Sequence, residues 1–256
     1  MTAEKVSWEK VWHAADGSSR QYGNGRHRFN RALDKIGYFI QSEISFKGGF
    51  RVLEAGCGNG AILQGLLDTF AVEGYGVDIS ENARDQAEKL MKQTGRSFAF
   101  SVRDVRDLEY EDNFFDLAIS LGVIEHMQNP EVAVREMARV LKPDGTAIIM
   151  TPNQLAFGFV DRLLKQSVGR WPFGYQTEYT PHALSALVSS CGLHVMKEEA
   201  LPRRRLSTDS GSLRTVSKLD QVVNSMLSTW GFYSYVFARK PRHVITGASN
   251  ADRSGR

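Results

Sequence analysis

Short apolar stretches and amphipathic stretches alternate along most of the chain, which is the pattern of an α/β domain. Each apolar stretch has the length of one buried strand, and the segments between them carry apolar residues every three or four positions. The predicted strands lie near residues 51–55, 73–77, 97–102, 114–120, 146–151, 193–198 and 231–240. We therefore expect a seven-stranded, mostly parallel sheet with helices on both faces. The last, aromatic stretch is predicted to be an antiparallel strand at the sheet edge.

The same pattern divides the chain into a cap, a domain and a tail. Residues 1–50 are amphipathic and predicted to form a helical cap, and residues 51–240 form the domain. Residues 241–256 are polar, lack apolar spacing and are predicted to be disordered. An insertion at about 154–178 mixes apolar and basic residues. It is predicted to be a lid over the active site, with weak contact to a membrane surface as the alternative.

A glycine-rich loop follows the first predicted strand. Gly56, Gly58 and Gly60 leave no side chains between the turn and a ligand, so the backbone can approach a cofactor closely. The next helix points the unpaired N–H groups of its first turn at the same place. An ordinary tight turn is the alternative interpretation. The third glycine comes one residue too early for the nicotinamide fingerprint, which argues against a dehydrogenase.

Two acids follow the next two predicted strands. Asp78 lies about twenty residues after the glycine loop, where a carboxylate can accept two hydrogen bonds from a ribose diol. The alternative is that Asp78 caps the helix that begins near Glu81. Asp104 can accept a hydrogen bond from an adenine amine, or it can pair with Arg103 or Arg106 at the surface.

The segment after the fourth predicted strand faces the place where chemistry would occur. Ligands of open parallel sheets bind at the carboxyl ends of the strands, and the residues from Leu121 to His126 lie there. His126 is the best-placed imidazole to act as a general base, and His182 and His27 are reserves. The alternative for His126 is a structural role in holding this loop.

These features occur in a recognisable order. The pattern E-x-G-x-G-x-G, Asp78, Asp104, an I-E-H segment and an L-K-P-D-G turn follow one another between about residues 50 and 153. This stretch resembles the class I S-adenosylmethionine-dependent methyltransferases, in the group that includes the ubiquinone-biosynthesis O-methyltransferases. The resemblance implies a Rossmann-like fold and S-adenosylmethionine as cofactor. The expected cofactor-binding residues are Glu54, Gly56, Cys57, Gly58, Asp78, Ile79, Asp104, Val105 and Leu121.

The same resemblance bears on metal binding. The quinone O-methyltransferases carry an acid three residues before the Glu-His pair, and that triad is linked to a divalent metal. Here the corresponding residue is Gly122, while Glu125 and His126 remain. No metal site is therefore predicted.

The resemblance predicts an enzyme that methylates a small molecule. We expect O-methylation of a hydroxyl on a quinone-, lipid-, sugar- or natural-product-like acceptor. The alternatives are a tRNA or protein methyltransferase and a non-catalytic cofactor-binding protein. The N/D-P-P-Y/F/W motif of amino methylation of nucleic acid bases is missing after the fourth strand, and so is a Pro-Cys nucleophile.

Composition adds a few limits. The net charge of +3 is too small to indicate nucleic acid as a partner. The two cysteines, Cys57 and Cys191, do not form a disulfide framework and suit a reducing compartment. Because the chain has neither a signal-peptide core nor an apolar run of about 20 residues, a cytoplasmic protein is expected. The arginines at 203–205 form a basic cluster, predicted to be a solvated charge run rather than an anion site. The oligomeric state is left open.

Overall fold

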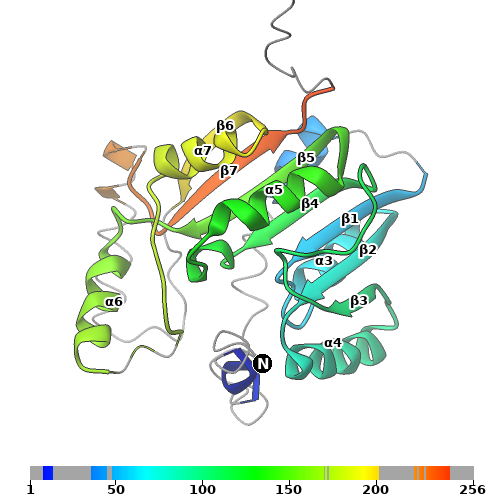
Figure 1. The fold of residues 1–256 in the computed structure, drawn as a ribbon, viewed down its shortest axis with the longest axis horizontal. Coiled ribbons are helices and arrows are strands. Elements are labelled where there is room, and N and C mark those ends of the chain that lie inside the picture. Colours follow the sequence, from blue (N-terminus) through cyan, green and yellow to red (C-terminus); the bar gives the residue numbers. More distant parts are fainter. Residues whose placement is uncertain are drawn as a thin grey trace, which may run out of the picture.

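The computed structural model contains a seven-stranded sheet with strand order β3-β2-β1-β4-β5-β7-β6 (Figure 1). It describes residues 8–13, 36–44, 48–169, 171, 173–201, 222–223, 225–227 and 229–242. The strands are β1 (Phe50–Ala55), β2 (Val72–Asp78), β3 (Ala99–Val102), β4 (Phe115–Leu121), β5 (Leu141–Pro152), β6 (His194–Leu201) and β7 (Tyr233–Arg239). His27, the arginines at 203–205 and the tail from residue 243 lie outside the described residues.

The sheet is mostly parallel, as the sequence predicts. Strands β1 to β5 pair in parallel, whereas β7 is antiparallel to both β5 and β6. The predicted position of the last strand was wrong, because β7 lies between β5 and β6 and not at the edge. The physical reason is burial. Residues 234–238 are all buried, so β7 needs a neighbouring strand on each side to pair its backbone groups.

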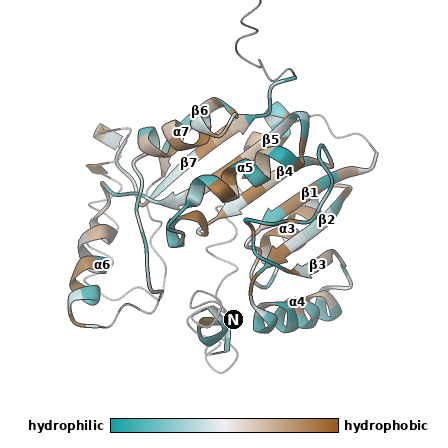
Figure 2. Ribbon diagram, viewed as in Figure 1, coloured by the Kyte–Doolittle hydropathy of each residue, from teal (hydrophilic) through white to brown (hydrophobic). Residues whose placement is uncertain are grey.

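Helices cover both faces of the sheet. The helix at residues 36–43, α3 (Ala61–Thr69) and α4 (Glu81–Thr94) pack on one face. On the other face lie α5 (Pro130–Val140) and α7 (Pro181–Ser190). α6 (Phe157–Ser167) extends beyond the end of the sheet (Figure 1). Each face therefore has its own apolar core, and the outer surface of α4 is mainly hydrophilic (Figure 2).

Local sequence signals explain where several of these elements begin and end. Ser80 Oγ accepts a hydrogen bond from Ala83 N at the start of α4, and Thr180 Oγ1 does the same for Ala183 N in α7. The predicted turn at residues 142–145 appears as an interruption of the pairing between β4 and β5, since the register moves from Leu141 to Thr146. The described residues contain no helix with the length and apolar character that a membrane span requires.

The strand order fixes where a ligand can bind. The chain leaves β1 toward β2 and β3 and then returns to the opposite side of β1 with β4. The loops after β1 and β4 therefore diverge, and a crevice is expected between them at the carboxyl ends of the strands. Figure 1 shows the helix at residues 8–13 at the end toward which β1, β2 and β4 point.

The core of α5 provides a test of this packing. Met137 is 1% exposed among the apolar side chains of α5, β4 and β5, whereas Val132 on the same helix is 40% exposed. We expect Met137→Ala to lower the free energy of unfolding by about 2–5 kcal/mol, because it removes buried methylenes and leaves a cavity. Val132→Ala should change it by less than about 1 kcal/mol. Urea unfolding of both variants measures the difference, and equal losses would contradict the assigned burial.

Candidate active site

The glycine loop is tied to the neighbouring strand by its backbone. Gly56 N and Cys57 N both donate to Val77 O, at 2.7 and 2.9 Å. Gly56 has a φ of 80°, and a Cβ at this position would overlap the Val123 side chain from the loop after β4. Glycine is therefore required here both for the backbone conformation and for the close approach of the two loops.

Asp78 occupies the centre of the loop arrangement. Its Oδ2 accepts from Gly58 N at 2.8 Å, and its Oδ1 accepts from Ser80 N at 3.0 Å. Burial raises the pKa of this carboxyl to about 6, against the effect of these hydrogen bonds. Among the described residues these are the hydrogen bonds within 3.5 Å to the two oxygens, and a carboxylate oxygen can accept two. The carboxylate can therefore still accept from two hydroxyls of a diol, and the helix cap is supplied by Ser80.

Glu54 of β1 and Cys57 of the glycine loop are both buried. Glu54 is 4% exposed, and its Oε2 accepts from Leu63 N at 3.3 Å, so it joins β1 to α3. Burial raises the pKa of both Glu54 and Cys57 well above their ordinary values. Direct contact with a cofactor stays a prediction for both side chains.

The other predicted cofactor residues gather at the same end of the sheet. Arg103 N donates to Asp78 O at 2.9 Å, which joins the loop after β3 to the end of β2. Asp104 accepts from Arg106 N and Nε, both at 2.9 Å, as the alternative interpretation expected. Ile79 and Leu121 are partly exposed, and Val105 is buried. The adenine contacts of Asp104 and Val105 stay predictions.

His126 lies in the short 3-10 helix η1 (Ile124–His126) after β4. Its Nδ1 is 2.9 Å from Tyr175 O, and its side chain is 11% exposed. Burial lowers the pKa of the imidazole, although the contact with the Tyr175 carbonyl acts in the opposite direction. The ring of Trp8 meets the imidazole edge to face at a centroid distance of 5.0 Å, and Phe173 lies 6.2 Å from both rings.

Glu125 is the most unusual group of the site. It is 2% exposed, and its Oε2 has no hydrogen-bond partner among the described residues. Burial raises its pKa to about 8, and the charge of Glu178 adds to the rise. A Cβ at Gly122 would lie 3.5 Å from Glu125 Oε1, so the two positions adjoin. Within the described part of the chain, no three acid, histidine or cysteine side chains form a group that could hold a metal.

The segment after α6 is fixed to this site. Thr177 N donates to Glu125 O at 2.8 Å, and Arg162 of α6 forms a buried ion pair with Glu178. Leu164 of α6 and Val168, which directly follows this helix, are exposed. The ion pair joins α6 to the segment that contacts Glu125, and the roles of α6 as a lid or as a membrane contact both stay predictions. The reserve base His182 lies at the surface, with its side chain 90% exposed.

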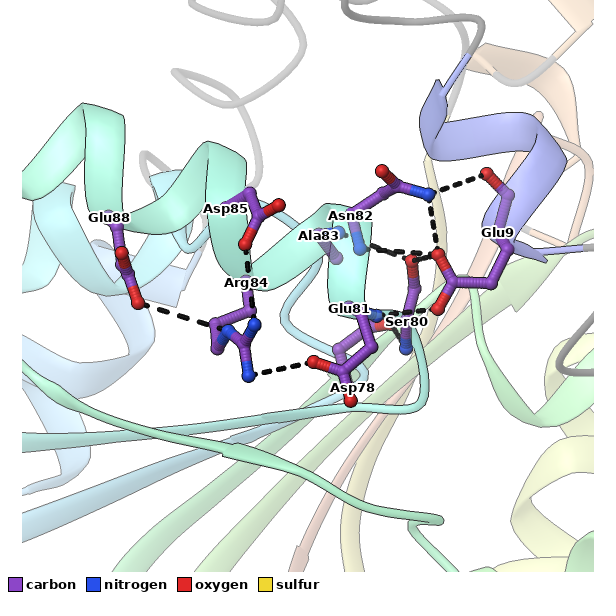
Figure 3. Close-up of polar contacts among 9 residues, drawn as sticks. All are labelled: Glu9, Asp78, Ser80, Glu81, Asn82, Ala83, Arg84, Asp85 and Glu88. Carbon is purple, nitrogen blue, oxygen red and sulfur yellow. Dashed lines mark hydrogen bonds and ion pairs between the residues drawn. The ribbon is translucent and has the colours of Figure 1, made fainter.

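Sequence reasoning missed the role of the first helix. Glu9 accepts hydrogen bonds from Glu81 N, Asn82 Nδ2 and Ser80 Oγ, at 2.6, 2.6 and 3.0 Å (Figure 3). These donors belong to the first turn of α4 and its cap, directly after Asp78. An isolated acid near the N-terminus gives no such signal, because its partners lie more than 70 residues away.

The comparison with protein families matches residues 53–149 to the methyltransferase domain. Ajmaline N-methyltransferase of Rauvolfia serpentina is 30% identical over 140 residues, which cover 54% of this chain and 48% of that protein. The ubiquinone biosynthesis O-methyltransferase of Dechloromonas aromatica is 32% identical over 120 residues, covering 45% and 50%. The chain thus spans about half the length of the curated relatives it matches.

Solved structures share the fold at low identity. The [4+2]-cyclase SpnF has a TM-score of 0.61 at 23% identity, covering 83% of this chain and 82% of that one. The phosphoethanolamine N-methyltransferase 2 of Haemonchus contortus, in complex with S-adenosyl-L-methionine, has a TM-score of 0.62 at 19% identity, covering 81% and 52%. Together with the strand order and the glycine loop, these matches confirm the resemblance. Residues 53–149 are therefore similar to the methyltransferase domain, and the chain has the fold of solved S-adenosylmethionine-dependent methyltransferases.

Proposed function

We propose that the protein transfers a methyl group from S-adenosylmethionine to a hydroxyl oxygen of a small acceptor of the quinone, lipid, sugar or natural-product type. The cofactor supplies a methyl group carried on a sulfonium. The observation that carries the proposal is the state of His126, which is enclosed, held at one nitrogen and placed at the carboxyl end of β4. Similarity to an O-methyltransferase supports the choice of oxygen.

The described residues fit the cofactor. Asp78 has acceptor positions left for the two hydroxyls of a ribose, after its bonds to Gly58 N and Ser80 N. Asp104, Val105 and Ile79 would contact the adenine, and Leu121 would contact the cofactor from the end of β4. The glycine loop would let the backbone approach the cofactor closely.

His126 has the properties of a general base. Because a carbonyl oxygen only accepts, the contact with Tyr175 O assigns the proton to Nδ1 and leaves the lone pair on Nε2. Nε2 has no hydrogen-bond partner among the described residues, and the nearest acid oxygen, Glu125 Oε1, is 3.8 Å away. Since burial lowers the pKa, the imidazole is neutral near pH 7 and can take the proton of a hydroxyl.

An amine acceptor is the second candidate. It is favoured by the similarity to ajmaline N-methyltransferase, which is as strong as the similarity to the O-methyltransferases. An amine that is already neutral needs no base, so the pH dependence of turnover separates the two candidates. Conversion of the cofactor to S-adenosylhomocysteine with matched panels of quinols, catechols, sugars, lipids and amines tests the proposed function directly.

The first prediction concerns Asp78 and cofactor affinity. Ribose hydroxyls donate to an ionised carboxylate, so binding should strengthen as the pH rises through the Asp78 pKa of about 6. Between about pH 5 and 7 the ionised fraction, and hence the affinity, should rise about tenfold. Calorimetry at several pH values measures this.

Substitution tests the same contact. Asp78→Asn should weaken binding at least about tenfold at pH 7 and flatten the pH dependence, since an amide nitrogen cannot accept. Asp116→Asn is the control, because Asp116 binds Arg51 N and Lys142 Nζ at the opposite end of the sheet. Wild-type affinity in Asp78→Asn would exclude the ribose contact.

The second prediction concerns His126. His126→Ala should lower turnover by about 10²–10⁴-fold, because the base is lost. Cofactor affinity should stay intact, because Asp78, the proposed ribose contact, is unchanged. Wild-type turnover should fall only below about pH 6.5, where the imidazole gains a proton. His126→Asn is the control for a structural role. Near-normal turnover in that variant, or wild-type turnover that does not fall as the pH drops below the His126 pKa found by titration, would rule out the base.

The third prediction concerns Glu125 and stability. Burial favours the neutral form of Glu125, so the folded protein holds this proton more tightly than the unfolded chain does. The stability that follows is fully present below the ordinary pKa of about 4.5 and is lost as the pH rises to about 8. Glu125→Gln should therefore match the wild type near pH 4 and be more stable at pH 8, by up to a few kcal/mol. Urea unfolding at both pH values measures this. The exposed Glu88→Gln should show no pH-dependent difference.

A further inference from the structure

The helix at residues 8–13 is anchored close to Asp78, the proposed ribose contact. Its Glu9 accepts from the backbone and side chain of Asn82, from Glu81 N and from Ser80 Oγ (Figure 3). Partial burial acts to raise the pKa of Glu9, but these hydrogen bonds lower it, so the carboxylate is ionised at neutral pH. An anion at the start of a helix also interacts favourably with the helix dipole.

The same helix covers the glycine loop. Trp12 O accepts from Gln86 Nε2 of α4 at 2.7 Å, which adds a second attachment one turn after Glu9. The ring of Trp12 packs directly on Gly58, so closely that a Cβ at Gly58 would overlap it. These contacts place the helix over the loop whose Gly58 N binds Asp78.

Trp8 extends the contact to the acceptor side. It lies next to Glu9 in the chain and meets His126 edge to face at 5.0 Å, at an interplanar angle of 79°. Phe173, from the segment after α6, approaches both rings. His126 is thus held by the Tyr175 carbonyl at Nδ1 and by an aromatic ring against the imidazole.

We infer that Trp8 is a positioning residue for His126, and that Glu9 keeps it in place by docking the helix at residues 8–13 onto α4. One hydrogen bond at Nδ1 leaves the imidazole free to swing about that contact. The Trp8 ring, held by the anchored helix in an edge-to-face contact with the imidazole, restricts this motion. The inference rests on the proposed role of His126 as the base.

The charged surroundings of His126 make the inference testable through its titration. The acid on its own element is Glu125, 3.8 Å away, and Glu178 behind it is paired with Arg162. Glu9 is bound to α4. Trp8 and Phe173 are uncharged. Replacing Trp8 therefore alters the packing and hydration of His126 without removing a charge.

The experiment measures the His126 titration by NMR of the full chain, together with kcat and the KM for both substrates. Trp8→Ala should move the His126 pKa up toward the ordinary value of about 6.5, because the ring becomes hydrated. It should lower kcat about tenfold, with a smaller effect on the KM for the cofactor. Trp8→Phe keeps an aromatic edge and should restore most of both properties.

Glu9 is tested with a matched control. Glu9→Gln should speed hydrogen exchange in residues 8–13 and shift the His126 pKa in the same direction as Trp8→Ala, because the docked helix is loosened. Glu88→Gln removes a similar charge from α4, where Glu88 pairs with Arg84 and lies away from Glu9 (Figure 3). It should leave exchange, titration and turnover unchanged.

Three results would overturn the inference, and they are distinguishable. An unchanged His126 titration in folded Trp8→Ala would remove the positioning role, whatever the activity of His126→Ala. If His126→Ala turns over normally, the base assignment fails, and the catalytic meaning of the Trp8 contact fails with it. A kcat loss in Trp8→Ala that Trp8→Phe does not restore would also count against positioning by the ring edge.

Discussion

The arrangement of the site depends on one buried carboxylate. Asp78 binds the N–H of Gly58 and the N–H of Ser80, so it joins the glycine loop, the end of β2 and the start of α4. Burial of an acid is costly unless its oxygens are hydrogen-bonded, and these two bonds reduce that cost. The Asp78 carbonyl accepts from Arg103 N, which adds the loop after β3. One residue thus sets the relative positions of the loops that would contact ribose and adenine.

The sequence predicted this part of the molecule because its signals are local. A strand, three closely spaced glycines and an acid about twenty residues later constrain one another through neighbouring parallel strands. The position of β7 depends instead on pairing with β5 and β6, and the strand's composition says only that it is a strand. Its burial on both sides could have been suspected from Val236 and Phe237 beside small residues, but the choice between edge and interior requires the whole sheet.

The acceptor side was less predictable for the same reason. His126 could be placed at the carboxyl end of β4 by its position in the chain, whereas the groups that hold it come from elsewhere. Tyr175 is 49 residues away along the chain, and Trp8 belongs to the first helix. Neither segment has a periodicity that encodes these contacts. The Asp104 contact is different, because its partner Arg106 lies only two residues away along the chain. The sequence could therefore offer this pairing as an alternative.

Glu125 lies beside His126, and its protonation state decides whether His126 can act as a base. Burial disfavours the charged form of both groups, so it raises the pKa of Glu125 and lowers that of His126. An ionised Glu125 at 3.8 Å would favour the imidazolium and so remove the lone pair that a base needs. Because Glu125 stays protonated near pH 7, His126 stays neutral at the same pH. The packing of Trp8, Phe173 and the segment after α6 excludes water from both groups, and the protonation state of the proposed base therefore depends on residues that do not themselves carry the reaction.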